Sequence, residues 1–289
     1  MRKLNDYYPA AVFIYFFAVI LVTMLSQNPA VSALSLIGSV AFFSTLPVKR
    51  AYRTHIFSLI LFLILTLINP LFSKSGETVL FYFNLRPITM EALFYGMNAA
   101  AALTAALYWF RCFSFIMTSD KLMLLFSFLS KKLAMVLTMS LRFIPLFKEQ
   151  YRKISDTQKA LGLYKDGNIV DSVKGRLRVT DILITWVFEG GIITAESMEA
   201  RGWGTGRRSF YSRYKILPSD IILLILSAVL AGFSVTAVYT ADFRFYPAIT
   251  YQHSMWTVIG LFSFLGLAVL PLIIHVQEVL RWRYLQSKI

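Results

Sequence analysis

The sequence contains little of what disulfide-rich or catalytic proteins depend on. Among its 289 residues there are one cysteine, Cys112, and three histidines, and only 15% of the residues are charged. A single cysteine excludes a disulfide framework within the chain and any metal site built from several cysteines. Soluble domains carry about 25% charged residues, so this composition argues against an ordinary soluble enzyme.

Acidic residues are scarcer than basic ones, and apolar residues are abundant. The chain has 15 Asp and Glu against 29 Lys and Arg, a formal net charge of +14, 57% hydrophobic residues and a mean hydropathy of +0.62. So much apolar surface excludes a disordered chain. A basic soluble protein would suggest nucleic-acid binding, which we do not expect here. A basic and very apolar chain indicates an integral membrane protein with its charge on the cytoplasmic side.

Six stretches are long and apolar enough to cross a bilayer, which takes about 20 residues. They cover 9–26, 30–48, 55–72, 92–110, 221–239 and 256–276. The first stretch has an alternative interpretation as a signal peptide, because a basic segment precedes it and small residues follow near Ala33. Its length, and the next stretch that begins almost at once, favour a membrane helix.

The basic residues predict how these stretches are oriented. If the N-terminus is cytoplasmic, 26 of the 29 basic residues lie on the cytoplasmic side, as membrane proteins prefer. The sequence therefore predicts an all-α, multi-pass plasma membrane protein with about six transmembrane helices and both termini in the cytoplasm. We divide it into a four-helix membrane region (1–117), a cytoplasmic region (118–217) and two C-terminal membrane helices (218–289).

The cytoplasmic region is predicted to contain two long amphipathic helices. The first covers 132–162, with apolar residues recurring every three or four positions, and it ends at Gly162, a residue that suits a helix C-terminus. Pro145 is expected to kink this helix or divide it near residue 144. The second covers 171–201 and ends at Gly202. Its apolar contacts are expected from Leu177, Ile182, Ile184, Ile193 and Met198.

These two helices allow two interpretations. They could lie on the inner leaflet, as basic amphipathic helices do, or form a docking platform for a partner protein. Composition alone does not separate the two.

Motifs for catalysis are absent from the sequence. There is no His-Glu-x-x-His and no closely paired acidic motif, and the glycine-rich stretch 202–209 lacks the spacing and lysine of a phosphate-binding loop. We find no charged residue at the apolar centres of the six stretches, which argues against a self-sufficient carrier. A membrane-embedded lipid-modifying enzyme with a basic cytosolic face is the alternative function, although it would need a dense acidic or histidine site.

Several polar signatures occur in a fixed order. They are Asn-Pro-Leu-Phe at 69–72, Pro-Ile-Thr at 87–89, Asp-Lys at 120–121, Leu-Arg-Phe-Ile-Pro at 141–145 and Ala-Arg-Gly at 200–202. Together they resemble the transmembrane (T) component of energy-coupling factor transporters, the CbiQ/EcfT-like family of ABC-type importers. The resemblance runs from about residue 69 to 214.

The resemblance implies a non-catalytic subunit without a cofactor. A T component joins two cytoplasmic ABC ATPase subunits to a small substrate-binding membrane subunit, the S component, which selects a vitamin or a transition-metal ion. ATP-driven motion passes through the long coupling helices. Their ends, which carry Ala-Arg-Gly motifs, dock in grooves of the ATPases.

Carried over residue by residue, the resemblance assigns two groups of positions. The implied ATPase-docking residues are Ala200, Arg201 and Gly202 at one helix end, and Lys159, Ala160, Leu161 and Gly162 at the other. The residues implied to shape the coupling helices are Asp120, Lys121, Arg142, Pro145, Glu196 and Glu199. For Arg142, a contact with lipid headgroups is an equal alternative. Leu161 departs from the family, which has arginine at this position, so docking at that end would be apolar or would use Lys159.

Overall fold

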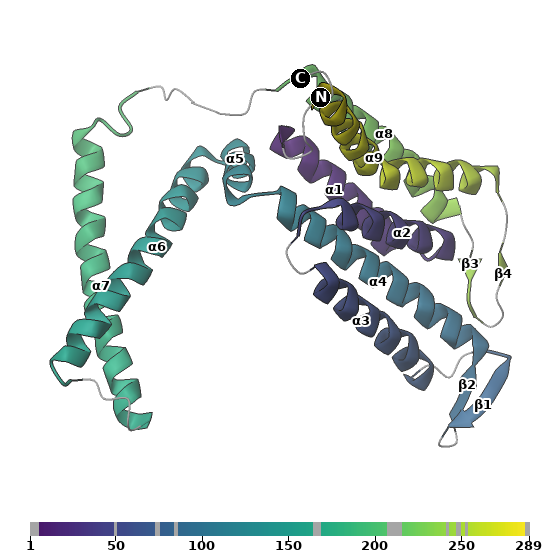
Figure 1. The fold of residues 1–289 in the computed structure, drawn as a ribbon, viewed down its shortest axis with the longest axis horizontal. Coiled ribbons are helices and arrows are strands. Elements are labelled where there is room, and N and C mark those ends of the chain that lie inside the picture. Colours follow the sequence, from purple (N-terminus) through teal and green to yellow (C-terminus); the bar gives the residue numbers. More distant parts are fainter. Residues whose placement is uncertain are drawn as a thin grey trace. The chain divides into compact units, whose positions relative to one another are not determined.

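The computed structural model describes residues 6–48, 51–72, 76–83, 86–163, 169–206, 216–240, 243–246, 250–251 and 254–286. Helices make up most of this described chain (Figure 1). Contacts group the chain into two compact parts. The first, here called the bundle, comprises Met1–Leu122 and Tyr214–Ile289, and the second, the crossed-helix part, comprises Met123–Arg213. The predicted boundaries at 117/118 and 217/218 stay predictions.

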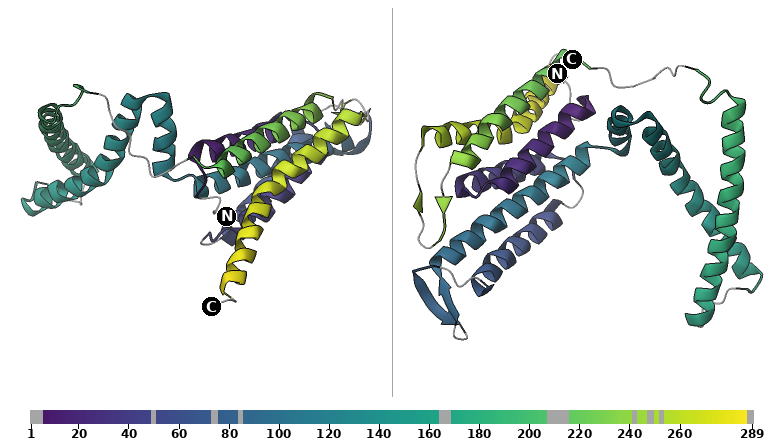
Figure 2. Two further views of the ribbon diagram at one scale, coloured as in Figure 1. Left: turned by 90° about the horizontal axis from the view of Figure 1, so that it is seen from above. Right: turned by 180° about the vertical axis from the view of Figure 1, so that it is seen from behind.

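The bundle consists of helices that pack side by side. They are α1 (Pro9–Leu25), α2 (Pro29–Thr45), α3 (Ala51–Phe72), α4 (Met90–Ile116), α8 (Pro218–Thr240) and α9 (Met255–Gln286). Helix α4 contacts α1, α2 and α3, while α8 packs against α1 and α9. Helix α3 therefore lies at one edge of the bundle and α8 with α9 at the other (Figure 2).

Four of these helices are long and apolar enough to cross a membrane. They are Ala51–Phe72, Met90–Ile116, Pro218–Thr240 and Met255–Arg281. The chain is therefore a multi-pass membrane protein. Helices α1 and α2 are apolar but have 17 residues each, or about 26 Å at about 1.5 Å per residue, so the count of six spans stays a prediction.

Aromatic side chains and a short chain of hydrogen bonds hold the centre of the bundle. Trp109 is buried among Tyr15, Phe16 and Phe42, with ring centroids 6.1–6.4 Å away. Its Nε1 donates to Ser35 Oγ at 3.0 Å, and Ser35 shares a 2.8 Å hydrogen bond with a threonine of α1. Within a membrane, such bonds between small polar residues help to fix how helices pack.

Two small hairpins occur in connections between the predicted membrane helices, although the predicted fold was all-α. Strands β1 (Val79–Phe83) and β2 (Arg86–Thr89) pair antiparallel between α3 and α4, and β3 (Phe243–Arg244) pairs with β4 (Thr250–Tyr251) between α8 and α9. These strands are short and rich in aromatic and β-branched residues, which fit a pleated surface. They are too short to give a periodic signal in the sequence.

The crossed-helix part contains most of α5 (Ser119–Leu129), together with α6 (Lys131–Ala160) and α7 (Ile169–Ala200). Helices α6 and α7 cross near their middles (Figure 1), where Phe147 meets Trp186 edge-on at 6.3 Å. Helix α6 runs unbroken through Pro145, so of the two predicted outcomes the division near residue 144 is wrong, and the kink stays a prediction. A proline removes one backbone donor, and the remaining hydrogen bonds of this 30-residue helix carry it past that point.

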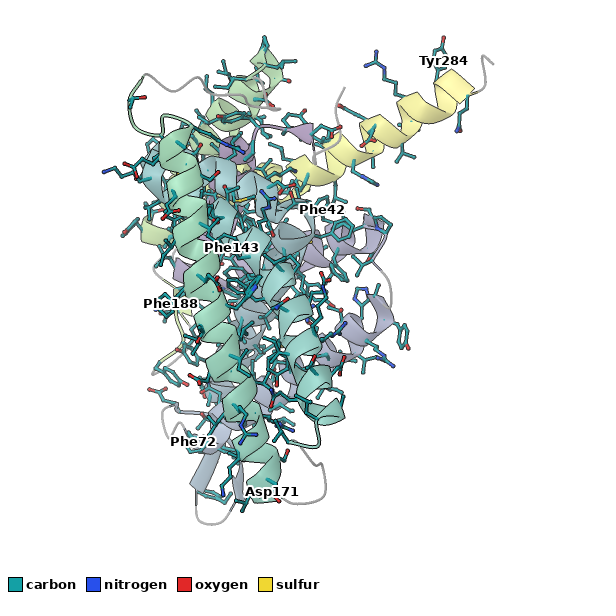
Figure 3. The ribbon with its side chains drawn as sticks, turned by 90° about the vertical axis from the view of Figure 1, so that its left-hand side faces the viewer. Phe42, Phe72, Phe143, Asp171, Phe188 and Tyr284 are labelled. Carbon is teal, nitrogen blue, oxygen red and sulfur yellow. The ribbon has the colours of Figure 1, made fainter. Side chains whose placement is uncertain are left out.

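Apolar side chains of α7 are largely exposed. Leu177, Ile182, Ile184 and Ile193, which were expected to make apolar contacts, are all exposed in the structure. Phe188 projects from the side of α7 (Figure 3) and is 69% exposed. Within this part Val179, only 1% exposed, is buried instead. Helices α6 and α7 contact each other at the crossing, and much of the apolar face of α7 is nevertheless exposed.

Candidate functional site

The end of α7 is shaped by a left-handed glycine. Gly202 has φ +74° and donates its N–H to the carbonyl of Glu199 at 2.8 Å, while Trp203 N–H reaches the carbonyl of Met198 at 3.0 Å. This pair of bonds is the Schellman arrangement, which closes a helix and turns the chain. Ala200, Arg201 and Gly202 thus lie together at an exposed, well-defined helix end.

The end of α6 repeats this arrangement bond for bond. Gly162 has φ +72° and donates to the carbonyl of Lys159 at 3.0 Å, and Leu163 N–H reaches the carbonyl of Gln158 at 3.1 Å. Leu161 takes the position at this cap that Arg201 takes at the other. The two helix ends are therefore equivalent in backbone and differ in the side chains they carry.

The two ends present different chemistry. At the end of α7, the Arg201 guanidinium is exposed beside a helix C-terminus, whose partial negative charge favours a cation. At the end of α6, Leu161 is 64% exposed and Leu163 is 52% exposed. Lys159 lies in the last turn of α6 and supplies the cation there. Figure 1 places the two ends on opposite sides of the crossing.

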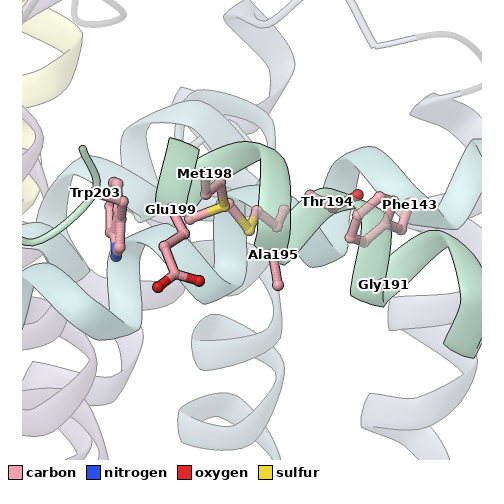
Figure 4. Close-up of a pocket in the computed structure, with 8 residues that line it drawn as sticks. Phe143, Gly191, Thr194, Ala195, Met198, Glu199 and Trp203 are labelled. Carbon is pink, nitrogen blue, oxygen red and sulfur yellow. The ribbon is translucent and has the colours of Figure 1, made fainter. Parts of the chain in front are cut away.

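A cavity of about 420 Å³ lies between α6 and α7 next to the Ala-Arg-Gly end (Figure 4). The α6 residues Met139 and Phe143 line one side, and Glu199 is its one acidic lining residue. The remaining lining residues come from α7 and its cap: Gly191, Thr194, Ala195, Met198 and Trp203. Of the residues predicted to shape the coupling helices, Glu199 therefore faces a cavity, while Glu196 is exposed on the helix surface.

Two further predicted residues, Arg142 and Pro145, lie on α6 before the crossing, and both are exposed. The polar half of α6 carries an ion pair between Lys153 Nζ and Glu149 Oε1 at 2.8 Å. The hydrogen bond and charge of Lys153 lower the pKa of the Glu149 carboxyl. Since both side chains are exposed, water and salt screen the pair, and it adds little to stability.

The two residues of the Asp-Lys motif have different structural roles. Asp120 is exposed in the first turn of α5, where its charge suits the positive end of the helix dipole. Lys121 is buried, with only 2% of its surface exposed, and its Nζ donates to the carbonyl of Ile116 at 2.9 Å. Ile116 is the last residue of α4, so Lys121 caps the end of that helix.

The Pro-Ile-Thr signature explains the start of α4. Thr89 Oγ1 accepts from Ala92 N at 3.4 Å and caps the helix. Glu91, also buried, accepts a hydrogen bond from Thr78 Oγ1 at 2.7 Å, which links the start of α4 to the residue before β1. A Cβ at Gly76 would meet Thr89 Oγ1 and Glu91 Oε2 at 2.7 Å, so only glycine fits there.

The Asn-Pro-Leu-Phe signature and the start of α4 meet in space. A Cβ on Gly96 of α4 would lie 2.9 Å from Asn69 Cβ and from the carbonyl oxygen of Thr66, both on α3. Gly96 therefore allows the two helices to approach closely.

Residues 73–75, which follow the Asn-Pro-Leu-Phe signature, and 207–209 of the glycine-rich stretch lie outside the described residues.

Two acidic residues were not singled out from the sequence as structural: Glu91 and Asp220. Asp220 is 2% exposed in the first turn of α8 and accepts from Leu217 N at 2.8 Å. An acid three residues after a helix cap is a known start signal, so the stretch Leu217-Pro-Ser-Asp220 contained the information. Glu91 follows Thr89 at the start of α4, where an acid is likewise favoured.

Metal-ligating side chains do not gather in the described ranges. No group of three or more His, Cys, Asp or Glu is placed there to hold a metal ion. The sites that the structure does define are therefore the two helix ends and the cavity beside one of them.

Comparison with known proteins places the chain in a family. The CbiQ family model, described as "Cobalt transport protein", matches residues 2–212. The energy-coupling factor transporter transmembrane protein EcfT of Listeria innocua is 35% identical over 105 residues, and that of Lactococcus lactis is 30% identical over 107. These segments are 35% and 34% of this chain and span only 39% and 40% of the relatives' length. Because the family model covers well over half of the sequence, the chain belongs to the CbiQ family of transport proteins.

Proposed function

We propose that this chain is the T component of an energy-coupling factor transporter, a non-catalytic subunit that passes ATP-driven motion to a substrate-binding S component. The pair of equivalent glycine caps at Gly162 and Gly202 carries this proposal. Two long helices that end in matched, exposed caps suit attachment to a pair of partner subunits, one at each end. The EcfT relatives, named as transmembrane proteins of such transporters, support the same role.

In the proposed mechanism the Arg201 end docks by charge. A guanidinium presents a planar fork that pairs with a carboxylate through two parallel hydrogen bonds. Gly202 turns the chain away directly after it, so nothing but the helix end enters the groove. The expected partner surface is a groove with an acidic residue on an ATPase subunit.

The Leu161 end docks by burial of apolar surface in the same mechanism. Leu161 and Leu163 are both exposed around the left-handed glycine, and covering them would stabilise the complex by removing apolar area from water. Salt weakens contacts between charges and leaves apolar contacts largely unaffected. Salt dependence therefore separates the two ends.

The exposed apolar faces of α6 and α7 are available to the S component in this proposal. They include Val136, Ile144, Ile182, Ile184 and Ile193. The S component selects the substrate, a vitamin or a transition-metal ion. We further propose that both termini and the crossed-helix part are cytoplasmic, because most basic residues then lie on that side.

The substitution Arg201→Glu tests this function. It places a like charge against the expected acidic groove, and loss of one partner of a desolvated charge pair weakens binding at least about 30-fold. We expect the variant to lose its ATPase subunits in co-purification and to lose uptake in cells. Arg178→Glu, the same change at an exposed position elsewhere on α7, is the control and should leave both unchanged.

Leu161→Ala completes the experiment. It should reduce capture less than Arg201→Glu does, and its effect should not depend on salt. Stable ATPase capture with normal uptake by Arg201→Glu would overturn the proposed function.

A further inference from the structure

The chain leaves the bundle at Leu122 and re-enters it at Tyr214. A charged side chain is buried close to each of these two points. Lys121 precedes the exit, Asp220 follows the return, and each is only 2% exposed. Burying a charge is costly unless partners satisfy it, so the partners of these two residues show what they hold together.

At the exit, Lys121 bonds to the end of α4 and is influenced by the charge of the N-terminal segment. Its Nζ donates to the carbonyl of Ile116, the last residue of α4, at 2.9 Å. Burial lowers the pKa of the Lys121 ammonium, and the negative charge of Asp6, in the segment before α1, partly offsets this effect. The exit is thus bonded to the end of α4, and the N-terminal segment contributes the charge of Asp6 there.

At the return, Asp220 uses both carboxylate oxygens. Oδ2 accepts from Leu217 N at 2.8 Å and closes the first turn of α8. Oδ1 accepts from Tyr8 N at 3.1 Å, across 212 residues of sequence. Between Asp6 and Tyr8, the side chain of Tyr7 is buried in the bundle core. Of three consecutive residues, Tyr8 therefore bonds to the return, Tyr7 packs in the core, and Asp6 acts on the exit through its charge.

We propose that residues 6–8 act as a clamp that fastens the exit and the return of the crossed-helix part to the ends of α4 and α8. Fastening at both points joins the two places in the bundle next to which the crossed-helix part begins and ends, so that the ends of α4 and α8 move together. Lys121 and Asp220 are then positioning residues for coupling. This inference rests on the proposed coupling function.

The test uses the complete transporter in lipid vesicles, with uptake and ATP hydrolysis measured together. Lys121→Met keeps the length of the side chain and removes its charge, and Asp220→Ala removes both acceptors. Each should lower substrate uptake per ATP hydrolysed about tenfold, the order expected for one lost bond to a charged group, with ATP hydrolysis little changed. Lys132→Met and Asp171→Asn, which change exposed residues of α6 and α7, are matched controls that should leave the ratio unchanged.

The double variant shows whether the two residues act through the same segment. Independent sites have additive effects, which here means a loss of about a hundredfold, whereas two ends of one clamp should together lose about tenfold. A hundredfold loss, or an unchanged ratio in the single variants, would overturn the clamp. A wild-type chain that fails to couple ATP hydrolysis to uptake would contradict the proposed function itself.

Hydrogen exchange gives a measurement that does not require transport. In Asp220→Ala the amide of Tyr8 should exchange faster than in the wild type, while the amides in the middle of α1 should stay protected. Unchanged exchange at Tyr8 would contradict the clamp even if transport fell.

Discussion

Single glycines determine the shape of the candidate docking ends. Gly202 is in the left-handed region, where an L-side chain is strained by about 1–2 kcal/mol, and a Cβ there would meet Thr205 Oγ1 at 3.1 Å. Gly190, twelve residues earlier on α7, is helical and has open space around its Cβ position. The same substitution at the two positions should therefore have opposite effects.

We expect Gly202→Ala to destabilise the end of α7 by about 1–2 kcal/mol and Gly190→Ala to stabilise the helix by about 0.5–1 kcal/mol. Hydrogen exchange at the Trp203 amide, which bonds to Met198, reports on the cap, and exchange in the middle of α7 reports on the helix. Equal exchange of the Trp203 amide in Gly202→Ala and the wild type would show that the left-handed backbone is not needed.

At this scale the sequence predicted the helix-ending glycines, because a glycine after a periodic run signals an end. It did not predict the bonding of Lys121 or Asp220. Asp220 meets Tyr8 across 212 residues, and no local pattern encodes such a contact. The buried state of Lys121 was equally hidden, since lysine is usually exposed.

Among the elements, the contact between α3 and α4 depends on one small residue. Gly96 has Asn69 Cβ and a backbone carbonyl of α3 within 2.9 Å of where a Cβ would lie. Backbone cannot move aside as a flexible side chain does. Small residues at such contacts let membrane helices pack closely.

Gly96→Ala should therefore push α3 and α4 apart and destabilise the bundle by about 1–3 kcal/mol, as overpacking does. Gly232→Ala on α8, where nothing lies within 4 Å of the Cβ position, is the control and should be neutral or stabilising. Thermal unfolding in detergent measures both. A higher unfolding temperature for Gly96→Ala than for the wild type would contradict the close contact.

Helices were the most predictable elements. The second amphipathic helix was expected over 171–201 and covers Ile169–Ala200. Pro145 was given too much weight, because one missing hydrogen bond does not end a helix with 15 residues on its far side. The apolar residues of α7 were expected to make contacts, but several of them are exposed. Periodicity identifies an apolar face without identifying what covers it.

For the whole molecule, the proposed topology can be tested by chemical labelling. Glu77, exposed in the loop before β1, should be extracellular, and Thr205, exposed after Gly202, should be cytoplasmic. Cys112 is the single cysteine and is fully buried in α4, so the background should be low. In intact cells, a membrane-impermeant thiol reagent should label Glu77→Cys, whereas Thr205→Cys should need permeabilised cells.

The reverse labelling pattern would place the N-terminus outside.

Composition alone identified the membrane class, because apolar runs of this length have few other uses. The fine assignment of spans was harder, since α1 and α2 stop at 17 residues.

The crossing of α6 and α7 has a mechanical consequence. Their contact at Phe147 and Trp186 lies 14 residues before Leu161 and 15 before Arg201, or about 21–23 Å at about 1.5 Å per residue. Rotation of one helix against the other about this aromatic contact would therefore move the two capped ends, here called the tips. A change of about 10° in the crossing angle, within the spread that packed helices allow, would move one tip by about 4 Å relative to the other helix. A small rotation at two rings thus becomes a displacement as large as a side chain.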